Sequence, residues 1–157
     1  MSTVYDLIED AIVSALMVKD APFKQVLKWG GSISDAELVN EIEKLASAQT
    51  APAAVVFYAG GPTNEGFASV LEEVAVFTIV IIVSGRSREA AMRGDAKSAG
   101  VYACLDWCRT NLHGKTLSNV PNPLRWQGNR RFGLPGQLLT TAAYAADYHA
   151  PLYYADG

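Results

Sequence analysis

The chain has 157 residues, of which 50% are hydrophobic and 18% are charged. This balance excludes a disordered protein, and the length fits a single domain spanning residues 1–157. The formal net charge is −3, so the chain does not have the excess of basic residues that nucleic-acid-binding proteins usually carry. DNA can therefore pass close to the protein without being bound by it.

We predict neither export nor membrane insertion. The N-terminal residues contain no basic segment of the kind that begins a secretory signal. The longest apolar run, Val74 to Val83, is interrupted only by Thr78 and is shorter than the roughly 20 residues that a membrane-spanning helix needs.

The first predicted element is a helix over residues 4–16. Its apolar side chains recur every three or four residues and therefore share one face: Val4, Leu7, Ile8, Ala11, Ile12, Ala15 and Leu16. Thr3 is placed to cap this helix, and Asp6 lies in the first turn, where the helix dipole favours an anion. A short strand is predicted from Phe23 to Trp29.

A second helix is predicted to begin at Ser34 to Glu37, which have the spacing of a capping box. Its apolar face consists of Leu38, Ile42 and Leu45. A strand from Ala53 to Tyr58 follows. The next residues, Ala59 to Gly66, are rich in glycine and other turn-forming residues and predict a loop.

The stretch from Glu72 to Ser84 is the most strand-like in the chain. Both of its alternating sets are apolar: Val74, Val76, Val80 and Ile82 on one side, and Ala75, Phe77, Ile79, Ile81 and Val83 on the other. A strand that is apolar on both faces lies at the centre of a sheet covered on both sides, or is partly covered by a neighbouring subunit.

The polar segment from Ser84 to Gly100 predicts a short helix or an ordered loop. A helix then follows with an apolar stripe made of Val101, Leu105, Cys108 and Leu112. His113 and Gly114 supply the cation and the glycine that commonly end a helix.

Two more strands are predicted near the C-terminus. In the first, Leu124, Trp126 and Phe132 alternate with Arg125, Gln127 and Arg131, which is typical of a half-exposed strand. Gly133 to Gly136 predicts a turn. In the long last strand, from Gln137 to His149, one face is formed by Leu138, Ala142, Tyr144, Ala146 and Tyr148.

The expected order is α-β-α-β-β-α-β-β. Because the strands occur in hairpin-like pairs, we predict the α+β class, with a mainly antiparallel sheet flanked by helices.

The sequence contains no recognisable catalytic or cofactor-binding motif. Neither histidine, His113 or His149, has a convincing catalytic partner, and the glycine-rich segments match no phosphate-binding loop. Cys104, Cys108 and His113 do not have the usual spacing of zinc ligands, so core packing of two reduced thiols is the favoured interpretation. We therefore expect no enzymatic activity, no cofactor and no metal.

Two groups of basic residues remain to be explained. The first comprises Arg86, Arg88, Arg93 and Lys97, and the second comprises Arg125, Arg130 and Arg131. The usual interpretation is a solvated face. The alternative is an interface that meets the acidic first or second helix of a neighbouring copy, where complementary charge would set the orientation.

Several segments, in order, resemble a known family. They are EEVAVFTIVIIV at 72–83, RSREAAMRGD at 86–95, GVYACL at 100–105, LHGK at 112–115 and PLRW at 123–126. Together with the amphipathic helix from Ile8 to Leu16 and the long final strand, this set resembles the Mu-like bacteriophage tail terminators. The resemblance covers nearly the whole chain, although its motifs are short and structural.

The resemblance implies an α/β domain, as in the lambda-type terminator, that assembles into a hexameric ring. Such a ring caps the head-proximal end of the tail tube, stops tube polymerisation and joins the tail to the neck proteins of the capsid. In a contractile tail it also meets the sheath, and DNA passes through the ring. The implied location is the virion, after assembly in the host cytoplasm. The family supplies no catalytic residues.

We predict two interaction surfaces. The first is the loop from Gly60 to Ser69, which carries Asn64, Glu65 and the apolar Phe67. The second is the segment from Gly85 to Gly100, which is too polar to be core. An ordinary surface loop is the competing interpretation of each. Two other functions also stay open: another neck component, such as a tail-completion or head-closure protein, or a small ligand-binding or enzymatic α/β domain.

Overall fold

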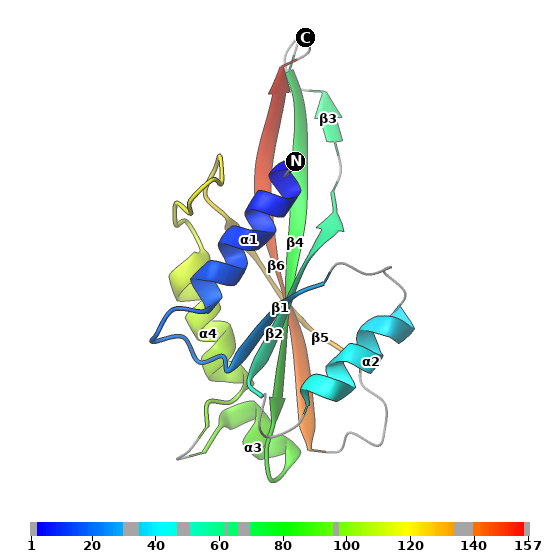
Figure 1. The fold of residues 1–157 in the computed structure, drawn as a ribbon, viewed down its shortest axis with the longest axis vertical. Coiled ribbons are helices and arrows are strands. Elements are labelled where there is room, and N and C mark those ends of the chain that lie inside the picture. Colours follow the sequence, from blue (N-terminus) through cyan, green and yellow to red (C-terminus); the bar gives the residue numbers. More distant parts are fainter. Residues whose placement is uncertain are drawn as a thin grey trace.

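The computed structural model describes residues 3–29, 35–46, 51–61, 63–65, 70–95, 98–133 and 140–155. The helices are α1 (Val4–Leu16), α2 (Asp35–Leu45), α3 (Arg88–Arg93) and α4 (Val101–Leu112). The strands are β1 (Gln25–Lys28), β2 (Ala53–Gly60), β3 (Thr63–Glu65), β4 (Val70–Ser84), β5 (Arg125–Arg131) and β6 (Thr141–Ala155). The fold is α+β, as the sequence predicts (Figure 1).

One mixed sheet organises the chain. Its strand order is β1-β2-β4-β6-β5, and the short β3 also pairs with β4. The two longest strands, β4 and β6, pair along their whole length, from Val70 opposite Ala155 to Ser84 opposite Thr141. All pairs are antiparallel except β1 with β2. That pair is parallel because α2 lies between the two strands in the chain and serves as the crossover that parallel neighbours need.

Several boundaries differ from the predictions: β1 is shorter than the predicted strand from Phe23 to Trp29, and β4 begins two residues earlier, at Val70. Within the segment predicted as a loop, β2 continues to Gly60, and residues 63–65 form β3, because β4 is long enough to offer a pairing partner to both. The last strand begins at Thr141 and continues through Pro151 to Ala155. The pairing of β5 with β6 stops at His149, so the β5 side of β6 is an unpaired sheet edge at Pro151. A proline is tolerated there because it has no N–H to offer a neighbouring strand. Residues 137–139 lie outside the described part.

The sheet has a packed core on each face, and β4 contributes to both. On one face, α1, α3 and α4 cover the inward-facing set from Ala75 to Val83, together with alternate residues of β6. On the other face, Leu38, Ile42 and Leu45 of α2 cover Val80 and Ile82. Figure 1 shows α2 on the opposite side of the sheet from α1 and α4. The prediction of a central strand is therefore confirmed.

The helix predictions explain which residues form these cores. Ile8, Ile12 and Leu16 of α1 are buried, and the predicted cap is present: Thr3 Oγ1 accepts from the Asp6 N–H at 3.2 Å, while Thr3 N donates to Asp6 Oδ2 at 3.1 Å. The buried stripe of α4 consists of Val101, Cys104, Cys108 and Leu112, so Cys104 occupies the place predicted for Leu105, which is half-buried. The second predicted capping box includes Ser34, which lies outside the described residues.

The α2 face is covered only along part of β4. Val80 and Ile82 are fully buried, whereas Val74 and Val76, on the same face nearer the start of the strand, are half-buried. The described residues therefore leave part of this face open, where coverage by a neighbouring subunit stays a prediction. No helix in the described ranges is long and apolar enough to cross a membrane.

Candidate functional site

The predicted interface residues lie at opposite ends of β4. Asn64 and Glu65 belong to β3 and pair with Glu72 and Leu71 near the start of β4, whereas Arg86 follows its end. At about 3.3 Å per residue, the stretch from Glu72 to Arg86 corresponds to roughly 45 Å. The two predicted surfaces are therefore separate sites. Phe67 and Lys97 lie outside the described residues.

The first basic group surrounds the short helix α3. Ser87 caps this helix by accepting from the Ala90 N–H at 3.1 Å. Arg86 and Arg88 are exposed. Arg93 pairs with Glu89 at 3.5 Å, and its guanidinium carbon lies 5.7 Å from the centre of the Tyr102 ring. Exposed pairs of this kind contribute little to stability, so these side chains stay accessible to a partner.

The second basic group lies on the edge strand β5. Arg130 Nε lies 3.2 Å from Asp147 Oδ2, and Asp147 Oδ1 accepts from the Thr78 hydroxyl at 2.7 Å. Arg125 and Arg131 are exposed and form no ion pair within the part of the chain that the structure describes. Two guanidinium groups on this edge are thus available to a partner.

The carboxylates of α1 are largely occupied within the chain. Asp6 is held in the capping box, and Asp10 pairs with Lys28 of β1 at 2.9 Å. Glu9 accepts from the Tyr58 N–H at 3.0 Å. Burial raises the pKa of Glu9, against the opposing effects of that N–H and of Lys28. These internal contacts leave α1 with less free negative charge than its sequence alone indicates.

A buried carboxylate that the sequence predictions missed joins α1 to the sheet. Glu73 is only 6% exposed. Its Oε1 accepts from the Tyr5 hydroxyl at 2.6 Å, and its Oε2 accepts from the Tyr58 hydroxyl at 2.7 Å. The alternation of side chains along the strand could have identified it. Glu73 belongs to the same alternating set as Ala75 and Phe77 and therefore points inward. The carboxylate and the two hydroxyls satisfy one another, as buried polar groups must.

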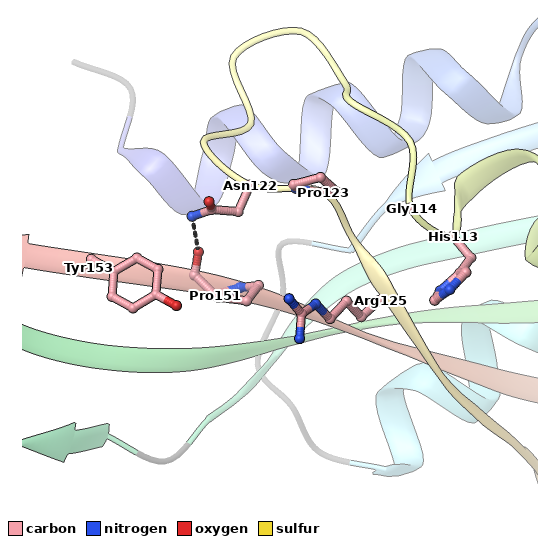
Figure 2. Close-up of a pocket in the computed structure, with 7 residues that line it drawn as sticks. All are labelled: His113, Gly114, Asn122, Pro123, Arg125, Pro151 and Tyr153. Atoms are coloured by element: carbon pink, nitrogen blue, oxygen red, sulfur yellow. Dashed lines mark hydrogen bonds between the residues drawn. The ribbon is translucent and has the colours of Figure 1, made fainter. Parts of the chain in front are cut away.

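A recess of about 320 Å³ lies where β5 begins beside β6. It is lined by His113, Gly114, Asn122, Pro123, Arg125, Pro151 and Tyr153 (Figure 2). The Asn122 amide donates to the Pro151 carbonyl at 2.8 Å and so closes part of the free edge of β6. His113 Nδ1 accepts from the Trp126 N–H at 2.9 Å, which leaves Nε2–H as the donor of the neutral ring.

No group of three metal-ligating side chains comes together in the described ranges. Cys104 and Cys108 lie on the buried face of α4 as free thiols, which confirms the predicted core packing. Burial raises the pKa of Cys104 to about 12, and it raises that of Cys108 further with the help of the neighbouring Cys104.

These thiols are expected to be inert in the native protein. Because the thiolate is the reactive form, an aromatic disulfide reagent at pH 8 should modify less than about a tenth of the total thiol in a sample of folded protein. It should label both after unfolding in guanidinium. Rapid labelling of the native protein would contradict the packing of α4 against the sheet.

The recess, the arginine edge and the two ends of β4 are features of the described residues that are open to a partner. No protein-family model matches this chain, and no curated protein matches it.

Proposed function

We propose that this chain is the ring-forming tail terminator of a Mu-like bacteriophage. The observation that carries the proposal is the construction of the sheet, which is open and ends in two unlike edges, β1 and β5. A contact between two different surfaces repeats head to tail, and it closes into a ring when the rotation permits. Unlike edges on one subunit suit this kind of contact, and the resemblance in sequence supplies the expectation of a hexamer.

The free positive charge at one edge suits contact with a second protein. Strand β5 carries Arg125 and Arg131, which have no ion pair within the described residues. These guanidinium groups would orient a partner surface that carries free carboxylates more than they would strengthen its binding.

The two ends of β4 suit contacts above and below a ring. The α3 end presents Arg86, Arg88 and Arg93, and the opposite end presents β3 beside the paired ends of β4 and β6 (Figure 1). In the proposed virion, one end meets the tail tube protein and the other meets the neck or connector proteins, with the sheath nearby in a contractile tail. DNA passes through the ring without specific binding, and assembly takes place in the host cytoplasm.

The exposed apolar side chains favour assembly over catalysis. Leu71 and Tyr153, near the shared end of β4 and β6, are 40% and 59% exposed. They point to opposite faces of the sheet, because Tyr153 lies opposite Glu72 and not opposite Leu71. Each face at this end thus presents one apolar side chain that a partner could cover. The described part of the chain offers no competing catalytic group of comparable definition.

The decisive experiment mixes the purified protein with tail tubes of the phage that encodes it. We expect binding at one tube end only, arrest of tube growth in a polymerisation assay, and a ring in particle images. Native mass spectrometry shows whether the ring also forms in the absence of tubes. Binding to the head side of the neck but never to tubes would indicate another neck component. A stable monomer that binds no tube and turns over a small molecule would overturn the proposal.

A further inference from the structure

The recess beside β5 has the chemistry of a carboxylate-binding site. Arg125 is an exposed guanidinium with no ion pair in the described ranges, and the Tyr153 side chain is 59% exposed. Figure 2 shows the Arg125 guanidinium and the Tyr153 hydroxyl pointing toward one another below Pro151. None of the seven lining residues is acidic, so nothing in the lining neutralises the guanidinium. A planar guanidinium beside a hydroxyl donor suits a carboxylate.

A second surface of the same chain offers an exposed carboxylate beside two exposed apolar side chains and the exposed Lys19. The turn from Met17 to Asp20, which we call the α1–β1 turn, follows α1 and leads toward β1. Met17 and Val18 are 64% and 46% exposed, so two of the large exposed hydrophobic side chains in the described residues are neighbours here. Asp20 is also exposed, and it has neither an ion pair nor a hydrogen bond to its side chain within the described residues.

The backbone holds this turn in a defined shape. The Met17 N–H donates to the Ser14 carbonyl at 3.3 Å, and the Ala21 N–H donates to the Val18 carbonyl at 3.0 Å. A turn that is ordered before binding loses less conformational entropy when a partner immobilises it. The surface therefore presents an apolar pair, Lys19 and the Asp20 carboxylate on a preformed support, and the carboxylate is the group in it that can attract a guanidinium.

We propose that the α1–β1 turn of one copy docks in the recess of the next copy. The Asp20 carboxylate binds the Arg125 guanidinium, while Met17 and Val18 pack against the apolar walls formed by Pro123, Pro151 and the ring of Tyr153. This inference rests on the proposed ring and names the contact that closes it. The turn leads to the edge strand β1, and Arg125 is the first residue of the edge strand β5, so the contact joins opposite edges of the sheet, as a head-to-tail ring requires.

Charge reversal in two separate proteins tests the contact. In Asp20→Arg the turn meets a recess of like charge, and in Arg125→Asp the recess meets a turn of like charge. Each variant alone should lose about 100-fold in the association constant for ring formation, because the facing charges then repel in place of attracting. A one-to-one mixture should recover rings in which the two variants alternate. At one contact the two introduced side chains meet, and they are opposite in charge. At the next contact the native Asp20 meets the native Arg125.

The readouts are native mass spectrometry and capping of tail tubes, with circular dichroism to show that each variant is folded. Asp106→Arg on α4 and Lys44→Asp on α2 are matched charge reversals at exposed positions, and both should leave rings intact. Normal rings from either test variant, or loss that mixing does not rescue, would overturn this contact and leave the ring itself standing. Absence of rings from the wild-type protein, with or without tubes, would instead remove the proposed function.

Discussion

Phe77→Ala should lower the free energy of unfolding by about 3–5 kcal/mol, the usual cost of a large cavity in a packed core. Phe77 is fully buried in the centre of β4, and its ring centre lies 5.4 Å from that of Tyr58. Because domains of this size are commonly stable by only about 5–15 kcal/mol, this loss removes a large share of the total. Urea denaturation followed by circular dichroism measures it.

Val76→Ala provides the matched control for this prediction. Val76 is the adjacent residue on the same strand, but it points to the opposite face and is only half-buried. We expect its replacement to cost about 1 kcal/mol, because fewer of its atoms leave water on folding. Equal losses at the two positions would show that the two faces of β4 are not covered as described.

Glu73→Gln should destabilise the protein by about 2–3 kcal/mol. Both carboxyl oxygens of Glu73 accept a hydrogen bond, from the Tyr5 and the Tyr58 hydroxyls, and leaving a buried partner unsatisfied costs about 1–3 kcal/mol. An amide offers only one acceptor oxygen, so its NH2 group must face a hydroxyl that now has to accept. The measurement is the midpoint and slope of a urea transition.

Glu72→Gln is the control, since Glu72 lies beside Glu73 on the opposite face and is half-exposed. A near-zero effect is expected there. Tyr5→Phe combined with Glu73→Gln should cost less than the sum of the two single changes, because both remove the same contact. Full additivity would argue against the Tyr5–Glu73 hydrogen bond, and a Glu73→Gln variant as stable as the wild type would argue against the pair of hydrogen bonds that Glu73 accepts.

Both predictions concern the region that supports the proposed assembly surfaces. Phe77 lies on the α1 face, and Glu73 fastens α1 and β2 to the part of β4 that leads toward Leu71. The tyrosine contacts hold α1 against the sheet, and the end of α1 carries the α1–β1 turn. A loosened Glu73 cluster should therefore weaken ring formation along with stability, whereas Asp20→Arg should weaken the ring alone.

The sequence by itself determined most of the elements and most of their buried faces, because hydrophobic periodicity depends on local geometry. The intervals in residues 4–16 predicted α1 and its buried stripe, and the doubly apolar run from Val74 to Val83 predicted a central strand. The ordered resemblance predicted a role in assembly, which stays a proposal.

Only the tertiary structure decided which distant residues meet. Strand pairing lengthened β2 and β6, made β3 a strand, and turned β1 parallel to β2 through α2. The acidic residues of the sequence predicted an acidic exposed face on α1. In the folded chain, Asp10 forms an ion pair with Lys28, and Glu9 accepts a hydrogen bond from the Tyr58 N–H. The recess likewise unites residues from the end of α4, from β5 and from β6, which lie far apart in the chain. Contacts over such separations depend on topology, which no local pattern records.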